Sequence, residues 1–348
     1  MAHDNGARDV VCAGELGDKM AHRLNRRRLI ALTGGGLLAG TLSLPFFSRW
    51  LWPRKPLVIA GSVWLGHELM FLARSEGWLA GSGIELLETA STSDSLEALA
   101  SGKADGAALT LDAMLRARAA NIPLTAILVF AVSVGADVVL ARVGIDTPAD
   151  LRGKRIGVEQ GALGALMLRK LIQVAGLEPS AVTVVPVPSD GHKRAWREGQ
   201  VDALITYEPI ASVLRAEGGY RIFDSRRLPD TIFDLLAVRT EVIRERPDSL
   251  QRLLTAHFRA LHHLRTNTQD AAFRLAKRLE LPAAEVLVAY RGVELPAPYQ
   301  NRKYLSGSHN QVLMAARTLS AILVEEGLMP QADDLRDLVD ATLLPQES

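Results

Sequence analysis

The 348-residue sequence contains a single cysteine, Cys12, which excludes an intrachain disulfide and a cysteine-rich metal site. Its eight histidines show no His-x-x-x-His or comparable ligand spacing, which argues against a structural zinc site. The chain also lacks an excess of either charge, because its formal net charge is +1. A near-neutral balance gives no electrostatic reason to expect a nucleic-acid partner. We therefore expect no metal, no cofactor and no nucleic acid.

The first 55 residues have the composition of a targeting segment and stand apart from the fold prediction. Residues 23–28 are rich in arginine, and residues 29–47 carry no charge over roughly the length that crosses a bilayer core. Arg26, Arg27 and Arg28 resemble the start of a twin-arginine signal, and an ordinary Sec signal fits equally well. No small-x-small site closes the run cleanly, so a cleaved signal and a retained anchor both stay open. With either one, we expect the folded part to be periplasmic.

Two methionines are candidate starts of this segment. Met20 opens the basic stretch in the way that a signal peptide opens, so the true start is Met1 or Met20. Cys12 precedes the hydrophobic run, and it therefore cannot be a lipoprotein cysteine.

The whole sequence is 48% hydrophobic, which suits a globular chain with full cores. From residue 56 onward, short apolar stretches that alternate with amphipathic ones predict α/β repeats and mainly parallel sheets. A first series of predicted strands covers residues 57–60, 83–87, 106–110 and 124–133. A second series covers residues 138–141, 155–158, 182–187 and 203–206. One more strand, at 235–238, precedes amphipathic helices at 247–265 and 311–326. Two similar series and a helical tail indicate two lobes.

Four segments in a fixed order carry a resemblance to a known family. They are residues 64–68 (Trp-Leu-Gly-His-Glu), 104–108, 150–158 (Asp-Leu-Arg-Gly-Lys-Arg-Ile-Gly-Val) and 201–209. Together they resemble the solute-binding proteins of ABC importers, above all the nitrate, sulfonate, taurine and thiamine-precursor type. The resemblance runs from about residue 56 to residue 242, and its most specific piece is the segment 150–158.

The resemblance implies a two-lobed periplasmic-binding-protein fold of type II, in which each lobe is a mixed, mainly parallel sheet flanked by helices. We expect a signal or anchor at residues 1–55, the first part of lobe 1 at 56–135, lobe 2 at 136–230, and a return to lobe 1 plus C-terminal helices at 231–348. The lobes would close on a small-molecule ligand. A monomer would then deliver that ligand to the membrane permease and ATPase subunits of an ABC importer.

Candidate ligand-binding residues lie at predicted strand ends, helix starts and crossings between lobes, where open α/β sheets bind ligands. Trp64 adds an aromatic face that can stack on a planar or cationic ligand, and a buried packing tryptophan is the alternative. The full set is Trp64, Glu68, Asp94, Thr110, Asp112, Ser133, Asp137, Glu159, Gly161, Tyr207, Glu208 and Asp234.

The acidic candidates have structural alternatives of unequal strength. Glu68, Asp94 and Asp112 can simply complement a helix dipole or cap a helix start. Asp137 and Glu159, with Glu208, have weaker alternatives and carry most of the argument. The helix after Gly161 offers N–H groups to an anion, but Glu159 beside it opposes that use.

The charge balance at these loops predicts the ligand class. The basic residues nearby are His67, Lys193 and Arg194, whereas an anion site needs arginine, lysine or many N–H donors. Burying an ammonium, amidinium or guanidinium group without a counter-charge costs several kcal/mol. We therefore predict a small organic cation or amine. A neutral amide or a heteroaromatic compound such as a pyrimidine is the first alternative, and a sulfonate or nitrate-type anion is the second.

Two other functions stay open beside an importer component. A periplasmic sensor subunit for a membrane signalling protein would be favoured by a retained anchor. Catalysis is disfavoured, because desulfinase-like relatives need a nucleophilic cysteine and Cys12 lies in or before the targeting segment. His67 beside Glu68 would be an acid–base pair, yet a lone histidine at a helix start is more often structural. We predict that the protein is not an enzyme.

Overall fold

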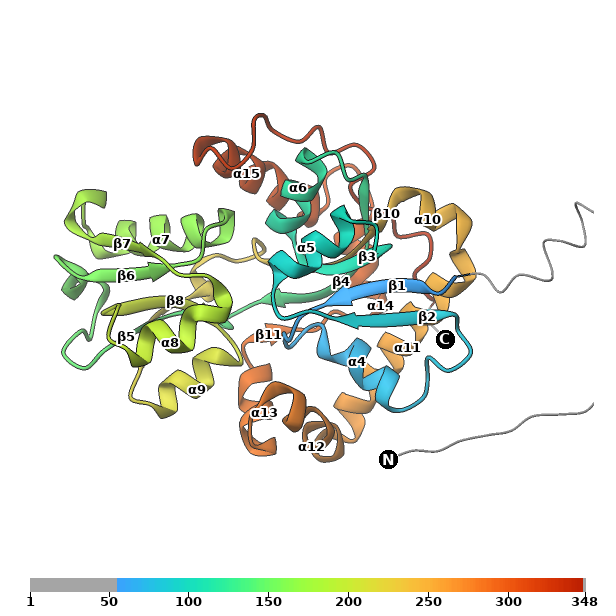
Figure 1. Ribbon diagram of the computed structural model, residues 1–348, viewed down its shortest axis with the longest axis horizontal. Coiled ribbons are helices and arrows are strands. Elements are labelled where there is room, and N and C mark those ends of the chain that lie inside the picture. The colour runs from blue at the N-terminus through green and yellow to red at the C-terminus, as the bar shows by residue number, and fades with distance from the viewer. Residues whose placement is uncertain (1–54, 347–348) are drawn as a thin grey trace, which may run out of the picture. The chain divides into compact units, whose positions relative to one another are not determined.

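The computed structural model describes residues 55–346 (Figure 1), in which helices and strands alternate and build two separate sheets. The predicted signal or anchor, including Cys12 and both candidate starts, lies outside the described residues. Within residues 55–346, no helix is long and apolar enough to cross a membrane.

The larger sheet has six strands in the order β11-β4-β10-β3-β1-β2. β1, β2 and β3 are parallel, whereas β10 runs antiparallel to both β3 and β4, and β11 runs antiparallel to β4. All ten residues of β4 are buried, because helices cover both faces of this sheet. Its strands are β1 (Leu57–Gly61), β2 (Ile84–Glu88), β3 (Gly106–Thr110), β4 (Leu124–Ser133), β10 (Phe233–Arg239) and β11 (Val293–Glu294).

The smaller sheet has five strands in the order β7-β6-β8-β5-β9. β6 pairs in parallel with β7 and β8, and β5 pairs antiparallel with β8 and β9. Successive side chains of a strand point to opposite faces, so Val139 packs into a core on one face and Val138 into a core on the other. The strands are β5 (Asp137–Ala141), β6 (Arg155–Val158), β7 (Thr183–Pro186), β8 (Ala203–Tyr207) and β9 (Tyr220–Asp224).

The chain passes between the sheets twice, from β4 to β5 and from β9 to β10. The first strand after each passage, β5 or β10, runs antiparallel to the strands on both of its sides. Both sheets are therefore mixed, with a parallel core of three strands in each. Asp137 and Asp234 lie at the starts of these two strands, close to where the chain changes sheets.

Twelve helices, counted within residues 55–346, cover the sheets (Figure 1). Ser91 caps α5 by accepting a hydrogen bond from the Asp94 N–H, and Asn310 caps α15 by accepting one from the Leu313 N–H. The helices are α4 (Glu68–Ser75), α5 (Thr92–Ala100), α6 (Leu111–Ala119), α7 (Ala162–Ala175), α8 (His192–Arg197), α9 (Ile210–Ala216), α10 (Thr240–Glu245), α11 (Pro247–Thr266), α12 (Thr268–Leu279), α13 (Ala283–Tyr290), α14 (Pro298–Leu305) and α15 (Gln311–Glu325).

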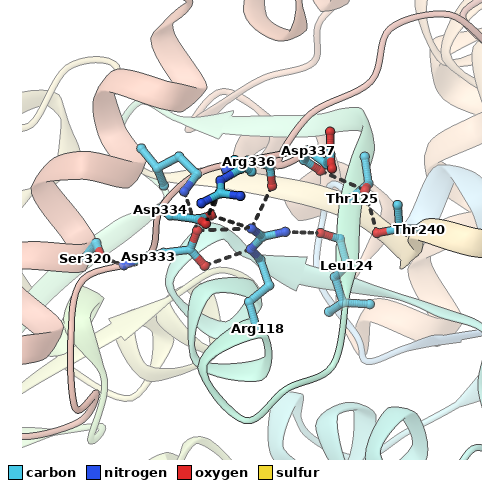
Figure 2. Close-up of polar contacts among 10 residues, drawn as sticks. Arg118, Leu124, Thr125, Thr240, Ser320, Asp333, Asp334, Arg336 and Asp337 are labelled. Carbon is cyan, nitrogen blue, oxygen red and sulfur yellow. Dashed lines mark hydrogen bonds and ion pairs between the residues drawn. The ribbon is translucent and has the colours of Figure 1, made fainter.

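The segment that follows α15 is held against the six-stranded sheet by Arg118 of α6 (Figure 2). The Arg118 guanidinium donates to the Asp333 carboxylate at 2.8 Å and to the carbonyl oxygens of Leu124 and Arg336 at 2.7 and 2.8 Å. Ala126 of β4 completes the attachment, because its N–H donates to the Leu338 carbonyl at 2.8 Å. The last described residues thus join the six-stranded sheet rather than the five-stranded one.

Candidate functional site

A cavity lies between the two sheets and is lined by residues at the carboxyl ends of their parallel strands. Trp64 follows β1, Thr110 ends β3, Glu159 follows β6 and Tyr207 ends β8. In open α/β sheets the carboxyl ends of parallel strands are the usual ligand sites. The two sheets contribute to one cavity because these ends face one another.

Eight of the twelve residues predicted from the sequence line this cavity. The six-stranded sheet and its loops supply four of them, and the five-stranded sheet and its loops supply the other four. They are Trp64, Thr110, Asp112 and Asp234, and Asp137, Glu159, Gly161 and Tyr207. Their contact with a ligand stays a prediction.

The carboxylates of the cavity receive few hydrogen bonds. Trp64 donates its indole N–H to Asp234 Oδ2 at 2.8 Å, and the Thr110 hydroxyl donates to Asp112 Oδ1 at 2.6 Å. Asp137 Oδ2 is buried and has no hydrogen-bond partner among residues 55–346. A buried acceptor without a partner carries the full cost of its desolvation, so this oxygen is a point where a ligand donor would be favourable.

Burial raises the pKa of three carboxyl groups of the cavity, Asp137, Glu159 and Asp234, and nearby acids add to the rise. Loss of hydration raises the pKa of Asp137 to about 6, and the nearby Asp112 charge adds to this rise. Burial and Asp112 likewise raise the pKa of Glu159 to about 7. The pKa of Asp234 is raised well above its usual value, first by burial and then by the Asp137 charge. The cavity is therefore short of positive charge.

The start of α7 also lines the cavity, and one of its N–H groups already faces a carboxylate of the chain. The Leu163 N–H donates to Asp112 Oδ2 at 3.4 Å, so Asp112 lies where an anion would otherwise sit. Gly164 permits this tight start of the helix, because a Cβ there would lie 2.2 Å from the Glu159 carbonyl oxygen. One of the N–H groups at the N-terminus of α7 thus already has an acceptor within the protein.

Two aromatic rings form a wall that joins the two sheets. Trp64 and Tyr207 meet edge to face, with ring centroids 5.2 Å apart and planes at 80°. Burial and the neighbouring Glu159 charge raise the pKa of the Tyr207 phenol above its usual value, so its hydroxyl stays neutral.

Sequence reasoning missed two basic residues of the cavity, Arg116 and His192. Arg116 lies one helical turn after Asp112 on α6, and this i, i+4 spacing was the signal that could have found it. His192 opens α8, another helix start that follows a strand of the smaller sheet. Lys193 and Arg194, the predicted neighbours, do not line the cavity, and Lys193 instead pairs with Glu280 at 2.8 Å.

Glu68 and Glu208 are buried but are engaged away from the cavity. The Glu68 carboxylate pairs with Arg278 Nε of α12 at 2.9 Å. Glu208 accepts from the Ser212 N–H at 2.9 Å, within the first turn of α9, and lies 3.5 Å from Arg215. Each carboxylate thus has a donor within the protein, and neither side chain is brought to the cavity.

Asp94 and Ser133 also lie outside the cavity lining. Asp94 is exposed in the first turn of α5, where its charge complements the helix dipole. The Ser133 hydroxyl is buried 2.7 Å from the Ser225 hydroxyl and accepts from the Asp137 N–H at 3.1 Å. The Ser133 hydroxyl therefore links the two passages between the sheets and holds the backbone of Asp137 in place.

No group of His, Cys, Asp and Glu side chains within residues 55–346 has an arrangement that could hold a metal ion.

Comparison with protein families and with known relatives identifies a common ancestry. Residues 64–271, more than half of the chain, match the model of the family described as NMT1/THI5 like. A relative from Brucella abortus, provisionally named a binding protein, is 27% identical over 159 residues, which are 44% of this chain and 50% of the relative. The chain thus spans about half the length of the curated relatives that it matches first.

Solved structures share the fold of this chain. The periplasmic aliphatic sulphonate binding protein SsuA from Escherichia coli superposes with a TM-score of 0.66 at 22% identity, over 82% of this chain and 97% of that protein. The expectation of a type II periplasmic-binding-protein fold is therefore confirmed. The desulfurization enzyme DSZB has the same fold, with a TM-score of 0.62 at 19% identity over 82% of this chain and 97% of that enzyme. The fold by itself thus serves both binding proteins and an enzyme.

Proposed function

Because this chain belongs to the NMT1/THI5-like family, we propose that it is the extracytoplasmic solute-binding component of an ABC importer and that its ligand is a small organic cation or amine. The observation that carries the ligand class is the charge of the cavity. Asp112, Asp137, Glu159 and Asp234 line it, whereas Arg116 is the only lysine or arginine of residues 55–346 that does so.

The physical argument rests on desolvation. A buried carboxylate without a counter-charge is costly, and proton uptake relieves that cost, as the raised pKa values of Asp137 and Glu159 indicate. A bound cation would replace those protons and restore the ionised carboxylates. An anion would add to the repulsion instead.

The distribution of the acids supports closure on the ligand. We propose that lobe 1 is formed by residues 56–135 and 231–348, and lobe 2 by residues 136–230. Lobe 1 then contributes Asp112 and Asp234, and lobe 2 contributes Asp137 and Glu159. A cation held between them would attract both lobes at once, and the closed form would be read by the permease and ATPase subunits.

Three ion pairs between the proposed lobes are compatible with a closed arrangement. Arg169 of α7 pairs with Glu325 of α15 at 2.9 Å and with Glu326 at 3.2 Å, and Lys193 of α8 pairs with Glu280 after α12 at 2.8 Å. All three pairs are largely exposed, so they contribute little to stability. We infer that the ligand supplies most of the driving force for closure.

A sulfonate-type or nitrate-type anion is the second candidate ligand. Arg116 at the cavity and the N-terminus of α7 favour it, as does the likeness to an aliphatic sulphonate binding protein. Asp112 counts against it, because its carboxylate already accepts from the Leu163 N–H at 3.4 Å.

A thermal-shift screen distinguishes the two ligand classes. The purified protein is heated with agmatine, putrescine or benzamidine, and in parallel with ethanesulfonate or nitrate. A ligand at about 100 times its Kd stabilises the folded state by about 2.7 kcal/mol, so a clear rise in Tm is expected with at least one cation. Stabilisation by the anions alone would overturn the cation proposal.

Variants of the cavity acids then test the site. Asp137→Asn and Glu159→Gln should lose the response to the cation while the protein stays folded. Asp94→Asn, at an exposed helix start outside the cavity, is the matched control and should keep the full response.

A further inference from the structure

Three residues that line the cavity each carry a buried polar atom without a partner. His67 Nε2, His192 Nε2 and Asp137 Oδ2 are each buried and have no hydrogen-bond partner within the described part of the chain. The three residues are 4%, 1% and 4% exposed. Four other buried atoms of residues 55–346, in Glu68, Arg215, His257 and Arg278, also lack a partner, but those residues do not line the cavity. Buried polar groups in folded proteins are nearly always hydrogen-bonded, so a bound molecule is the natural source of partners for the three that belong to cavity residues.

The hydrogen bond at the other nitrogen of His67 determines what kind of partner it needs. Nδ1 lies 3.2 Å from the backbone carbonyl oxygen of Ser62. A carbonyl oxygen can only accept, so Nδ1 carries the proton and Nε2 of the neutral ring is an acceptor. Burial lowers the pKa of His67 to about 4, and the ring is therefore neutral at physiological pH. The missing partner of His67 is a donor.

Asp137, in the five-stranded sheet, also lacks a hydrogen-bond donor at one of its oxygens within the described residues. Its Oδ2 has no partner within residues 55–346, and a carboxylate oxygen accepts hydrogen bonds. The Thr206 hydroxyl, 3.0 Å from His192 Nδ1, can donate or accept, so His192 does not restrict the ligand in this way. His67 and Asp137, from the loops and strands of different sheets, are thus two cavity residues with buried acceptors that lack donors.

We propose that the charged group of the ligand bears several N–H donors, as a primary ammonium, an amidinium or a guanidinium does, and that His67 determines this specificity by accepting one of them. The inference rests on the proposed function and narrows it. It excludes quaternary ammonium compounds, which the Trp64 and Tyr207 rings would otherwise suit. A trimethylammonium group has no N–H and would leave both acceptors buried and unpaired.

The test is a comparison of ligands that have equal charge and a decreasing number of N–H groups. Isothermal titration calorimetry at pH 8 measures benzylamine, its N,N-dimethyl derivative and benzyltrimethylammonium, and also agmatine beside its trimethylammonium analogue. We expect affinity to fall at each loss of N–H groups, with at least about a tenfold loss when the last N–H is replaced by a methyl group. Equal or tighter binding of the quaternary compounds overturns the inference.

Variants of His67 separate hydrogen bonding from the size of the cavity. His67→Gln can present an amide oxygen as an acceptor and should keep most of the preference for N–H donors. His67→Leu removes the acceptor and should reduce the amine-to-quaternary ratio by about tenfold, whereas simple steric exclusion would leave that ratio unchanged. The matched control is His257→Leu, because His257 is equally buried and also packs on Phe130 but does not line the cavity.

The outcomes distinguish this inference from the proposed function. If amines and quaternary compounds bind with similar affinity, the inference about N–H donors is wrong, but the proposed cation-binding function is still supported. Binding of ethanesulfonate or nitrate alone, or of none of the cations, overturns both. If His67→Leu does not fold, the affinities of the unaltered protein for the graded series still decide the question.

Discussion

Glu68 and Asp137 are both buried carboxylates at the start of a secondary-structure element, but only Glu68 has a cation beside it. Around Glu68, Arg278 pairs with two carboxylates, Glu68 and Glu88, and stacks 3.6 Å from the centre of the Phe71 ring. Around Asp137, the nearest charges that act on it are those of other acids. The negative charge around Glu68 is thus balanced by a cation within residues 55–346, whereas the negative charge around Asp137 is not. We call the two the balanced and the unbalanced region.

The pKa values alone do not reveal this difference. Burial raises the pKa of Glu68 to about 7 and that of Asp137 to about 6. The direction is the same because desolvation is the largest cause in both regions, and the nearby Arg278 charge only moderates it for Glu68. What separates a structural carboxylate from a candidate ligand contact is therefore the presence of a partner, not the shift.

Removing the cation from the balanced region should have the largest effect on stability. Arg278→Met leaves Glu68 buried without its partner, and we expect a loss of about 3–5 kcal/mol in the free energy of unfolding. Urea unfolding at pH 7.5 measures it. Arg274→Met, one turn earlier on α12 and exposed, is the control and should cost several times less. Equal losses of stability in the two variants would show that the buried pair of Arg278 and Glu68 has no special importance for the fold.

Removing a negative charge from the unbalanced region should instead increase the free energy of unfolding. Because the folded-state pKa of Asp137 is about 6 against an ordinary value of 3.8, ionisation destabilises the ligand-free fold as pH rises through 6. Asp137→Asn should therefore match the unaltered protein near pH 4 and exceed it by about 3 kcal/mol at pH 8. Urea unfolding across this range tests the difference, and a variant that is less stable at pH 8 would argue against it.

Cation binding should itself depend on pH in the same window. The pKa of Glu159 is about 7 in the ligand-free protein, and the carboxylate must be ionised to hold a cation. If Glu159 alone ionises, affinity should fall by about a hundredfold from pH 8 to pH 5. Titration calorimetry in buffers of different ionisation enthalpy should also detect proton release near pH 6. An affinity that rises toward acid would instead favour an anion.

The smallest effect is expected at Asp94, which belongs to neither region. Asp94→Asn keeps the Ser91 cap on the Asp94 N–H, so stability should change by no more than about 0.5 kcal/mol. Ligand affinity, measured by calorimetry, should be unchanged. A large loss of binding would mean that Asp94 acts on the ligand through α5, whose Thr92, Ser93 and Leu96 line the cavity.

Local patterns in the sequence were enough to locate most of the fold. The apolar stretches at residues 106–110 and 124–133 coincide with β3 and β4, because a buried strand needs a continuous apolar run. β9 was missed, since Tyr220 and Arg221 are exposed and interrupt the pattern. β11 has only two residues and was missed for lack of any periodicity.

The candidate site was predictable to the extent that it follows strand ends. Asp112, Asp137, Glu159 and Asp234 all meet at one cavity because topology brings strand ends together. The same rule also selected Glu68 and Glu208, and it overlooked Arg116, which lies on a helix one turn beyond the strand end. The position of a residue along a strand or helix predicts where its Cα lies, but not which groups surround the functional group of its side chain.

The sequence by itself determined the alternation of strands and helices, the series that resembles a family of binding proteins, and the acids at the strand ends. These features depend on neighbours within a few residues of one another. Only the tertiary structure decided which acids are balanced, because Arg278 reaches Glu68 from 210 positions away in the chain. It also made Nε2 of His67, a residue that lines the cavity, an acceptor, through the contact of Nδ1 with the Ser62 carbonyl. Charge and hydrogen-bond balance in a buried site depends on packing between distant segments, and no local pattern contains that information.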